Sequence, residues 1–199
     1  MRRWGVAATA AVMMLAGCSG HASPGASESS SESEAATPSA SASAAGRISA
    51  APPERPAVMD NNTEEGAAAA VAYYIRQSLY AEATGDDSEL QAMSGPGCKP
   101  CQYFVDRVHD ENRGQWLEIP DVDVLDTHVF PSEQHDGAFH VELTVRRGEA
   151  EVIDPQGIRG PIGSQDAVIG FDAAQESGGW QMLDGAIQAD ENASPEATE

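Results

Sequence analysis

The stretch FHVELTVR, residues 139–146, decides the fold class of this 199-residue chain, because its side chains alternate strictly between apolar and polar. A period of two predicts a β-strand with one face on a core and the other in solvent. Less regular strand patterns cover residues 117–130, 151–154, 167–171 and 180–187. Turn sequences separate these segments, so we expect them to form an antiparallel meander.

Three helical patterns precede the strands. Asn62 or Thr63 can cap a long helix that ends near Gly85. A short helix is expected over residues 86–93, and a third begins near residue 98, with Gly114 as its predicted stop. Helices followed by an antiparallel meander indicate an α+β fold, with two or three N-terminal helices packed on one face of a curved sheet.

Amino-acid composition distinguishes one globular domain from the segments that flank it. Residues 58–189 form one domain's worth of sequence. Residues 18–57 are rich in Ser, Ala, Pro and Glu and contain one aliphatic β-branched residue, Ile48, so they predict a disordered tether. Residues 190–199 predict a disordered acidic tail.

The N-terminus resembles a bacterial lipoprotein signal. Two arginines precede an apolar run from residue 4 to residue 15, which is too short for a membrane span of about 20 residues. The sequence Leu15-Ala16-Gly17-Cys18 then looks like a lipobox, which makes residues 1–17 the signal peptide and Cys18 the lipidated residue. The expected location is the extracytoplasmic face of the cell membrane, although an ordinary secretory signal would also end in small residues.

The net charge of −21 restricts the partners. Such a chain repels phosphate backbones, so no nucleic acid is expected, and it does not favour docking on anionic lipid. The expected partners are the membrane, through the lipid on Cys18, and a small ligand or an envelope protein. No cofactor or metal motif occurs in the sequence.

Cys98 and Cys101 form the one chemically reactive motif of the domain. A CxxC pair at a helix start suggests a dithiol with a lowered thiolate pKa, and hence a redox function. The strand that precedes such a pair in thioredoxins is missing here, and a structural zinc would need a second pair of ligands. In an exported protein the preferred interpretation is a structural disulfide.

Asp126 and His128 are weak catalytic candidates. They share the parity of Val122 and Val124, so an unbroken strand would turn them towards the core, where an Asp could orient a His as a general base. Leu125, with Thr127 and Val129, competes for the same face, and one β-bulge would reverse the assignment.

Two resemblances accompany these patterns. The element order resembles the cone-shaped fold named after nuclear transport factor two, in which helices cover the concave face of a bent sheet. A second resemblance rests on the motifs Tyr73-Tyr74, Tyr80-Ala81, Ala83-Thr84-Gly85-Asp86, Leu90, Ser94, Pro96, Cys98-Lys99-Pro100-Cys101 and Gly178-Gly179-Trp180. In these motifs the domain resembles an uncharacterised family of actinobacterial lipoproteins, a domain of unknown function that implies no activity.

Together these features predict a lipid-anchored, non-catalytic domain that binds a small ligand or a partner protein. One alternative is an enzyme that uses Asp126 and His128, with Tyr73 or Trp116 nearby. The other alternative is a surface dithiol oxidoreductase that uses Cys98 and Cys101.

Overall fold

The computed structural model describes residues 47–189. The predicted signal peptide (1–17), Cys18, most of the predicted tether and the predicted tail at 190–199 lie outside the described residues. The helical elements all precede the strands: η1 (Ala57–Asp60), α1 (Glu64–Thr84), α2 (Ser88–Met93) and α3 (Lys99–His109). The strands follow as β1 (Gln115–Trp116), β2 (Val122–Pro131), β3 (Phe139–Arg147), β4 (Ala150–Ile153), β5 (Arg159–Ile162), β6 (Gln165–Glu176) and β7 (Gly179–Ala189). The α+β class is therefore confirmed.

Helix α1 begins and ends where the sequence predicts. The Thr63 side chain accepts a hydrogen bond from the Gly66 amide at 3.2 Å, and Gly85 ends the helix in the left-handed region at φ 83°. Helix α3 stops five residues before the predicted Gly114. Asp110 causes the earlier stop, because its carboxylate accepts from the Asn112 amide at 2.9 Å and turns the chain.

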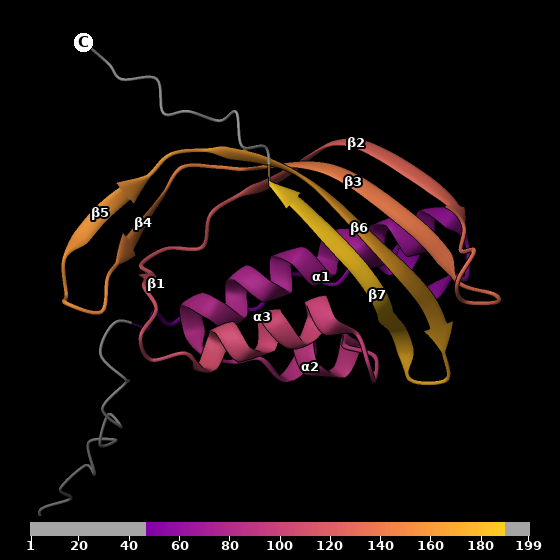
Figure 1. The fold of residues 1–199 in the computed structure, drawn as a ribbon, viewed down its shortest axis with the longest axis horizontal. Helices are drawn as coiled ribbons and strands as arrows, with labels where there is room; N and C mark the ends of the chain where they lie inside the picture. The colour runs from indigo at the N-terminus through magenta and orange to yellow at the C-terminus, as the bar shows by residue number, and fades with distance from the viewer. Residues whose placement is uncertain (1–46, 190–199) are drawn as a thin grey trace, which may run out of the picture. The chain divides into compact units, whose positions relative to one another are not determined.

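The strands form two antiparallel sheets rather than the single sheet expected from sequence. One sheet has the order β2-β3-β6-β7 and the other has the order β1-β4-β5. Strands β4 and β5 extend the β3–β6 pair beyond a break at Gly148 and Gly163 (Figure 1). The strand predicted over residues 117–130 begins only at Val122, because Pro120 supplies no amide to a ladder. The short β1 lies before the predicted range and joins the second sheet.

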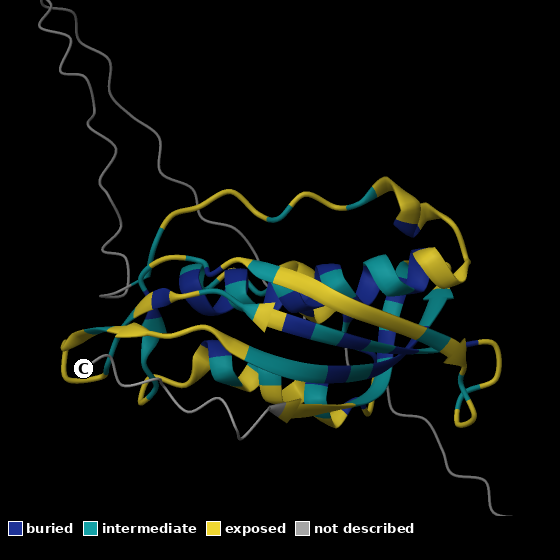
Figure 2. Cartoon of the chain, turned by 90° about the horizontal axis from the view of Figure 1, so that it is seen from above, coloured by how far each residue is buried: buried dark blue, intermediate teal, exposed yellow. Residues whose placement is uncertain are grey.

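Helix α1 lies beneath the larger sheet, and Tyr74 is at the centre of their contact. Its ring is fully buried and packs edge-on against Phe171 of β6 at 5.4 Å and Phe104 of α3 at 6.0 Å between ring centroids. Figure 2 shows the buried positions concentrated on the helices and on the strands that face them. No helix within residues 47–189 is long and apolar enough to cross a membrane.

The chain contacts the domain before residue 58, the predicted start of the globular part. The Ile48 amide donates to the Ala83 carbonyl at 3.0 Å, and the Arg47 guanidinium donates to the Val108 carbonyl. The Ile48 side chain also packs on a second apolar cluster, which contains Trp116. The single β-branched aliphatic residue of the predicted tether is therefore an attachment point.

A substitution at Gly185 of β7 tests how closely the strands of the larger sheet pack. A Cβ atom at this position would lie 2.5 Å from the Gly170 carbonyl oxygen and 2.6 Å from the Phe171 ring. We expect Gly185→Ala to lower the free energy of unfolding by about 1–3 kcal/mol, measured by urea denaturation. Gly178→Ala is the control, because no atom lies within 4 Å of its added Cβ. Equal stability of the two variants would contradict this packing.

Candidate functional site

A cavity of about 480 Å³ opens between the helices and the two sheets. Small-molecule sites in proteins commonly occupy about 300–1,000 Å³ and have mostly apolar walls with a few polar groups. The volume of this cavity falls within that range. Helices α1 and α3 and strands of both sheets supply its mostly apolar walls. The main wall residues are Ile75, Leu79, Phe104, Val122, Val145 and Ile169.

The polar end of the cavity is organised around Glu82 of α1. Its carboxylate is 5% exposed and accepts three hydrogen bonds, from Arg107 Nε at 2.9 Å, Arg113 Nη2 at 2.9 Å and Trp116 Nε1 at 2.7 Å. A different nitrogen of the Arg107 guanidinium, Nη1, donates to the Tyr103 hydroxyl at 2.7 Å. These contacts join α1, α3, the following loop and β1.

Burial raises the pKa of the Glu82 carboxyl above its ordinary value. The loss of water around the carboxylate outweighs the opposing effects of the Arg107 charge and of the hydrogen bonds from Trp116 and Arg107. Both carboxylate oxygens are already engaged by donors, so Glu82 serves as an anchor for the two arginines rather than as an available base.

Arg147 of β3 lies at the polar end of the cavity, on the side formed by the sheet. Its guanidinium lies 5.3 Å from the centroid of the Trp116 ring and donates to the carbonyls of Gly148 and Gly163, at 2.8 and 2.6 Å. Burial lowers the pKa of Arg147 from its ordinary value. One side chain thus spans the break between the two sheets and also lines the cavity.

Trp116 was expected near a site from sequence, whereas Glu82 and its arginine partners were not predicted. A signal for Glu82 was present, because it follows Ile75 and Leu79 at helical spacing and so continues an apolar stripe with a charged residue. The arginines carry no local signal, since their partner lies 25 and 31 residues away in the chain.

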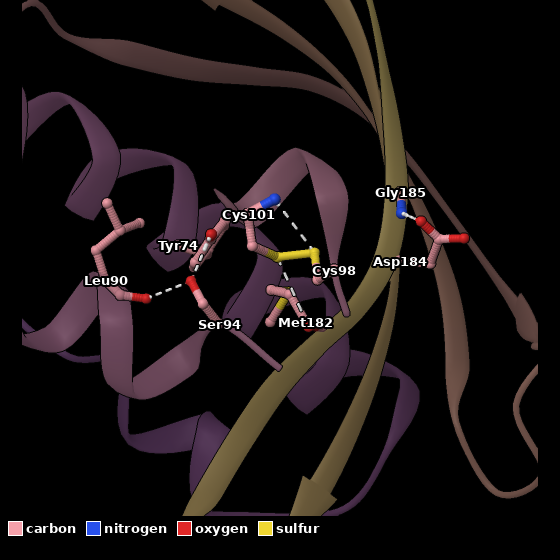
Figure 3. Close-up of a disulfide and its surroundings, with 8 residues drawn as sticks. All are labelled: Tyr74, Leu90, Ser94, Cys98, Cys101, Met182, Asp184 and Gly185. Carbon is pink, nitrogen blue, oxygen red and sulfur yellow. Dashed lines mark hydrogen bonds between the residues drawn. A yellow bond between two sulfur atoms is a disulfide. The ribbon is translucent and has the colours of Figure 1, made fainter. Parts of the chain in front are cut away.

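The structure joins Cys98 and Cys101 in a disulfide with a Cα–Cα distance of 5.2 Å (Figure 3). Cys98 caps α3, and its sulfur accepts from the Cys101 amide at 3.2 Å. The two residues are only 3% and 1% exposed and pack near Met182 of β7. Thiol–disulfide exchange requires access to a sulfur, so this environment suits a structural bridge. No group of three His, Cys, Asp or Glu residues suited to a metal occurs within residues 47–189.

Asp126 and His128 lie outside the cavity. Their side chains are 62% and 54% exposed, with Asp126 Oδ2 at 3.2 Å from His128 Nε2. The prediction that they point to the core assumed an unbroken strand, and it is wrong because the β2–β3 register shifts between Val124 and Asp126. After the shift Val129, with the opposite parity, packs on the core.

A second polar cluster lies on the outer face of the larger sheet. The Asp172 side chain is 5% exposed and bonds His140 Nδ1 at 2.7 Å through one oxygen, while its other oxygen accepts from the Ser132 hydroxyl at 2.7 Å. The Ser132 oxygen in turn accepts from the amides of Gln134 and His135. The cluster therefore fastens the β2–β3 loop to β6, away from the cavity.

Truncation of Glu82 tests the polar end. Glu82→Ala leaves the Trp116 N–H and two half-buried guanidinium groups without their acceptor, so we expect a loss of about 3 kcal/mol in the free energy of unfolding. Glu82→Gln keeps one oxygen and should cost less. The matched control is the exposed Glu118→Ala, for which a change below about 0.5 kcal/mol is expected. Equal effects of Glu82→Ala and Glu118→Ala in urea denaturation would refute the arrangement.

Comparison with known proteins identifies a family but no activity. No curated protein sequence matches the chain significantly. Among solved structures, the "intermembrane space region of chloroplast protein ARC6" is similar over 64% of this chain and 98% of its own, with 15% identity and a TM-score of 0.48. A family described as "Family of unknown function (DUF6318)" matches residues 39–186, which confirms the expectation of an uncharacterised domain. The chain belongs to this family, DUF6318.

Proposed function

We propose that this protein is a lipid-anchored extracytoplasmic protein whose domain binds a small ligand without transforming it. The cavity under the helices carries the proposal, because its size and largely apolar walls are those of a ligand site. Binding of another envelope protein is the other expectation from sequence, and no surface feature of residues 47–189 supports it as specifically.

A non-catalytic function agrees with the chemistry of the cavity walls. Among the described residues, Glu82 is the only acidic side chain that lines the cavity, and three donors engage its carboxylate. No histidine or cysteine of the described part lines it. Two hydroxyl residues also line it: the Ser78 hydroxyl donates to the Ile75 carbonyl at 2.8 Å, and the Tyr103 hydroxyl accepts from Arg107. The described lining thus offers binding groups rather than a nucleophile paired with an available base.

The proposed anchoring rests on the sequence alone. Leu15-Ala16-Gly17-Cys18 follows a short apolar segment, as in lipoprotein signals. A disulfide in the domain is compatible with export to an oxidising compartment. The lipid on Cys18 would hold the chain at the outer face of the membrane.

Replacement of the lipidated cysteine tests the anchor. We expect Cys18→Ser to move the protein from the membrane fraction to the soluble fraction of fractionated cells, because no lipid can be attached at this position. The matched control is Ser19→Ala, which leaves the cysteine in place. Retention of the Cys18→Ser protein in the membrane fraction would contradict lipid anchoring.

Filling of the cavity tests ligand binding. The neutral fluorescent probe N-phenyl-1-naphthylamine should bind the full chain carrying Cys18→Ser, and Ala167→Trp should weaken this binding at least tenfold because Ala167 lines the cavity. Ala186→Trp is the control, since Ala186 is exposed on the opposite face of the same sheet. Similar affinities of the two tryptophan variants, measured by fluorescence titration, would exclude the cavity as the site.

A further inference from the structure

The polar end of the cavity is positively charged, whereas the protein as a whole is negatively charged. Arg107, Arg113 and Arg147 line it, and Glu82 supplies the only opposing charge from the described residues. The chain as a whole carries −21. Charges act more strongly in a partly closed, apolar cavity than in water, because the effective dielectric constant is lower. This end of the cavity therefore favours an anion over a cation.

Arg113 has hydrogen-bonding capacity to spare. A guanidinium group carries five N–H donors, and within residues 47–189 the Arg113 side chain makes one hydrogen bond, from Nη2 to Glu82. Its side chain is 21% exposed, and none of its remaining donor nitrogens is fully buried, so a ligand in the cavity can reach them. A carboxylate or phosphate can accept two parallel hydrogen bonds from such a group. A cation would meet three like charges, and its one opposite charge, Glu82, is already engaged.

The rest of the cavity suits an apolar chain. Beyond the arginines its walls are mainly aliphatic and aromatic side chains of α1, α3 and the sheets. Three exposed apolar residues, Tyr103, Ile162 and Ile187, also line it and are 54%, 37% and 40% exposed. An apolar ligand segment lying against these side chains would remove their surface from water.

We infer that the ligand is an amphiphile with one acidic head group, a carboxylate or a phosphate. The head pairs with Arg113 beside Arg107 and Arg147, and the apolar tail lies along the aliphatic wall. This inference rests on the proposed function, since it names the chemical class that the same cavity accepts.

Four ligands with one tail and different heads test the inference. Dodecanoate, dodecyl phosphate, dodecanol and dodecylamine, each below its micelle concentration, compete with N-phenyl-1-naphthylamine for the full chain carrying Cys18→Ser. We expect the two anions to bind at least tenfold more tightly than dodecanol, because charge-assisted hydrogen bonds form only with them. Dodecylamine should bind most weakly. The order of the two anions identifies the head group as carboxylate or phosphate.

Variants locate the head group. Arg113→Gln should reduce the preference for dodecanoate over dodecanol to about twofold or less, while dodecanol binding stays within a few-fold of its original value. Arg146→Gln is the matched control, because this arginine pairs with Asp166 outside the cavity at 2.7 Å. If Arg113→Gln fails to fold, salt supplies the second measurement. Raising the salt concentration should weaken dodecanoate binding to the unmodified cavity and leave dodecanol binding unchanged.

The outcomes separate this inference from the proposed function. Equal binding of dodecanol and both anions would overturn the anionic head group while the ligand-binding function stands. Tightest binding of dodecylamine would also overturn it and would assign recognition to Glu82. Failure of every tailed ligand and of the naphthylamine probe to bind would refute the proposed function itself.

Discussion

The Glu82 carboxylate is the interaction on which the helical layer and the smaller sheet both depend. It receives hydrogen bonds from α3, from the loop after α3 and from β1, so it joins parts of the chain that are 25 to 34 residues distant. A buried ion pair adds little net stability compared with apolar packing of the same volume. The raised pKa of Glu82 shows that burial of this charge has a cost. In the proposed function, recognition of a charged group is a better reason for the arrangement than stability.

The cavity lies at the end of the larger sheet, beside the break that leads to β4 and β5. Near the middle of β3 and β6, α1 packs directly on the sheet and Tyr74 touches Phe171, whereas Val145 and Ile169, nearer the break, line the cavity. Beyond Gly148 and Gly163, β4 pairs with β1, whereas β3 pairs with β2, and β5 pairs with β4 alone. Arg147 holds both sides of the break through the two glycine carbonyls. Arg147 therefore bridges the break in the sheet and contributes positive charge to the cavity.

Local sequence patterns predicted the helices and strands. The features that were not predicted depend on pairing between strands that are distant in the chain. The capped helix α1 and the alternating strand β3 follow from spacing within one segment, and both are confirmed. The division into two sheets depends on which strands pair across Gly148 and Gly163, and no local pattern encodes this. The face of Asp126 and His128 stayed open in the sequence, because the bulge before Asp126 changes parity without a distinctive residue type. Glu82 was visible only as a charge on an apolar stripe.

The proposed anchor and the proposed ligand class support each other through charge. A protein with a net charge of −21 repels anions at long range, which slows their approach and costs affinity outside the cavity. The same charge opposes electrostatic docking on an anionic membrane, so charge would not hold the domain near that surface. A lipid on Cys18 would solve both problems, because amphiphiles concentrate in the membrane and a tethered domain meets them at a raised effective concentration. Long-range repulsion would then matter less than the short-range attraction of Arg107, Arg113 and Arg147, which acts only within the cavity.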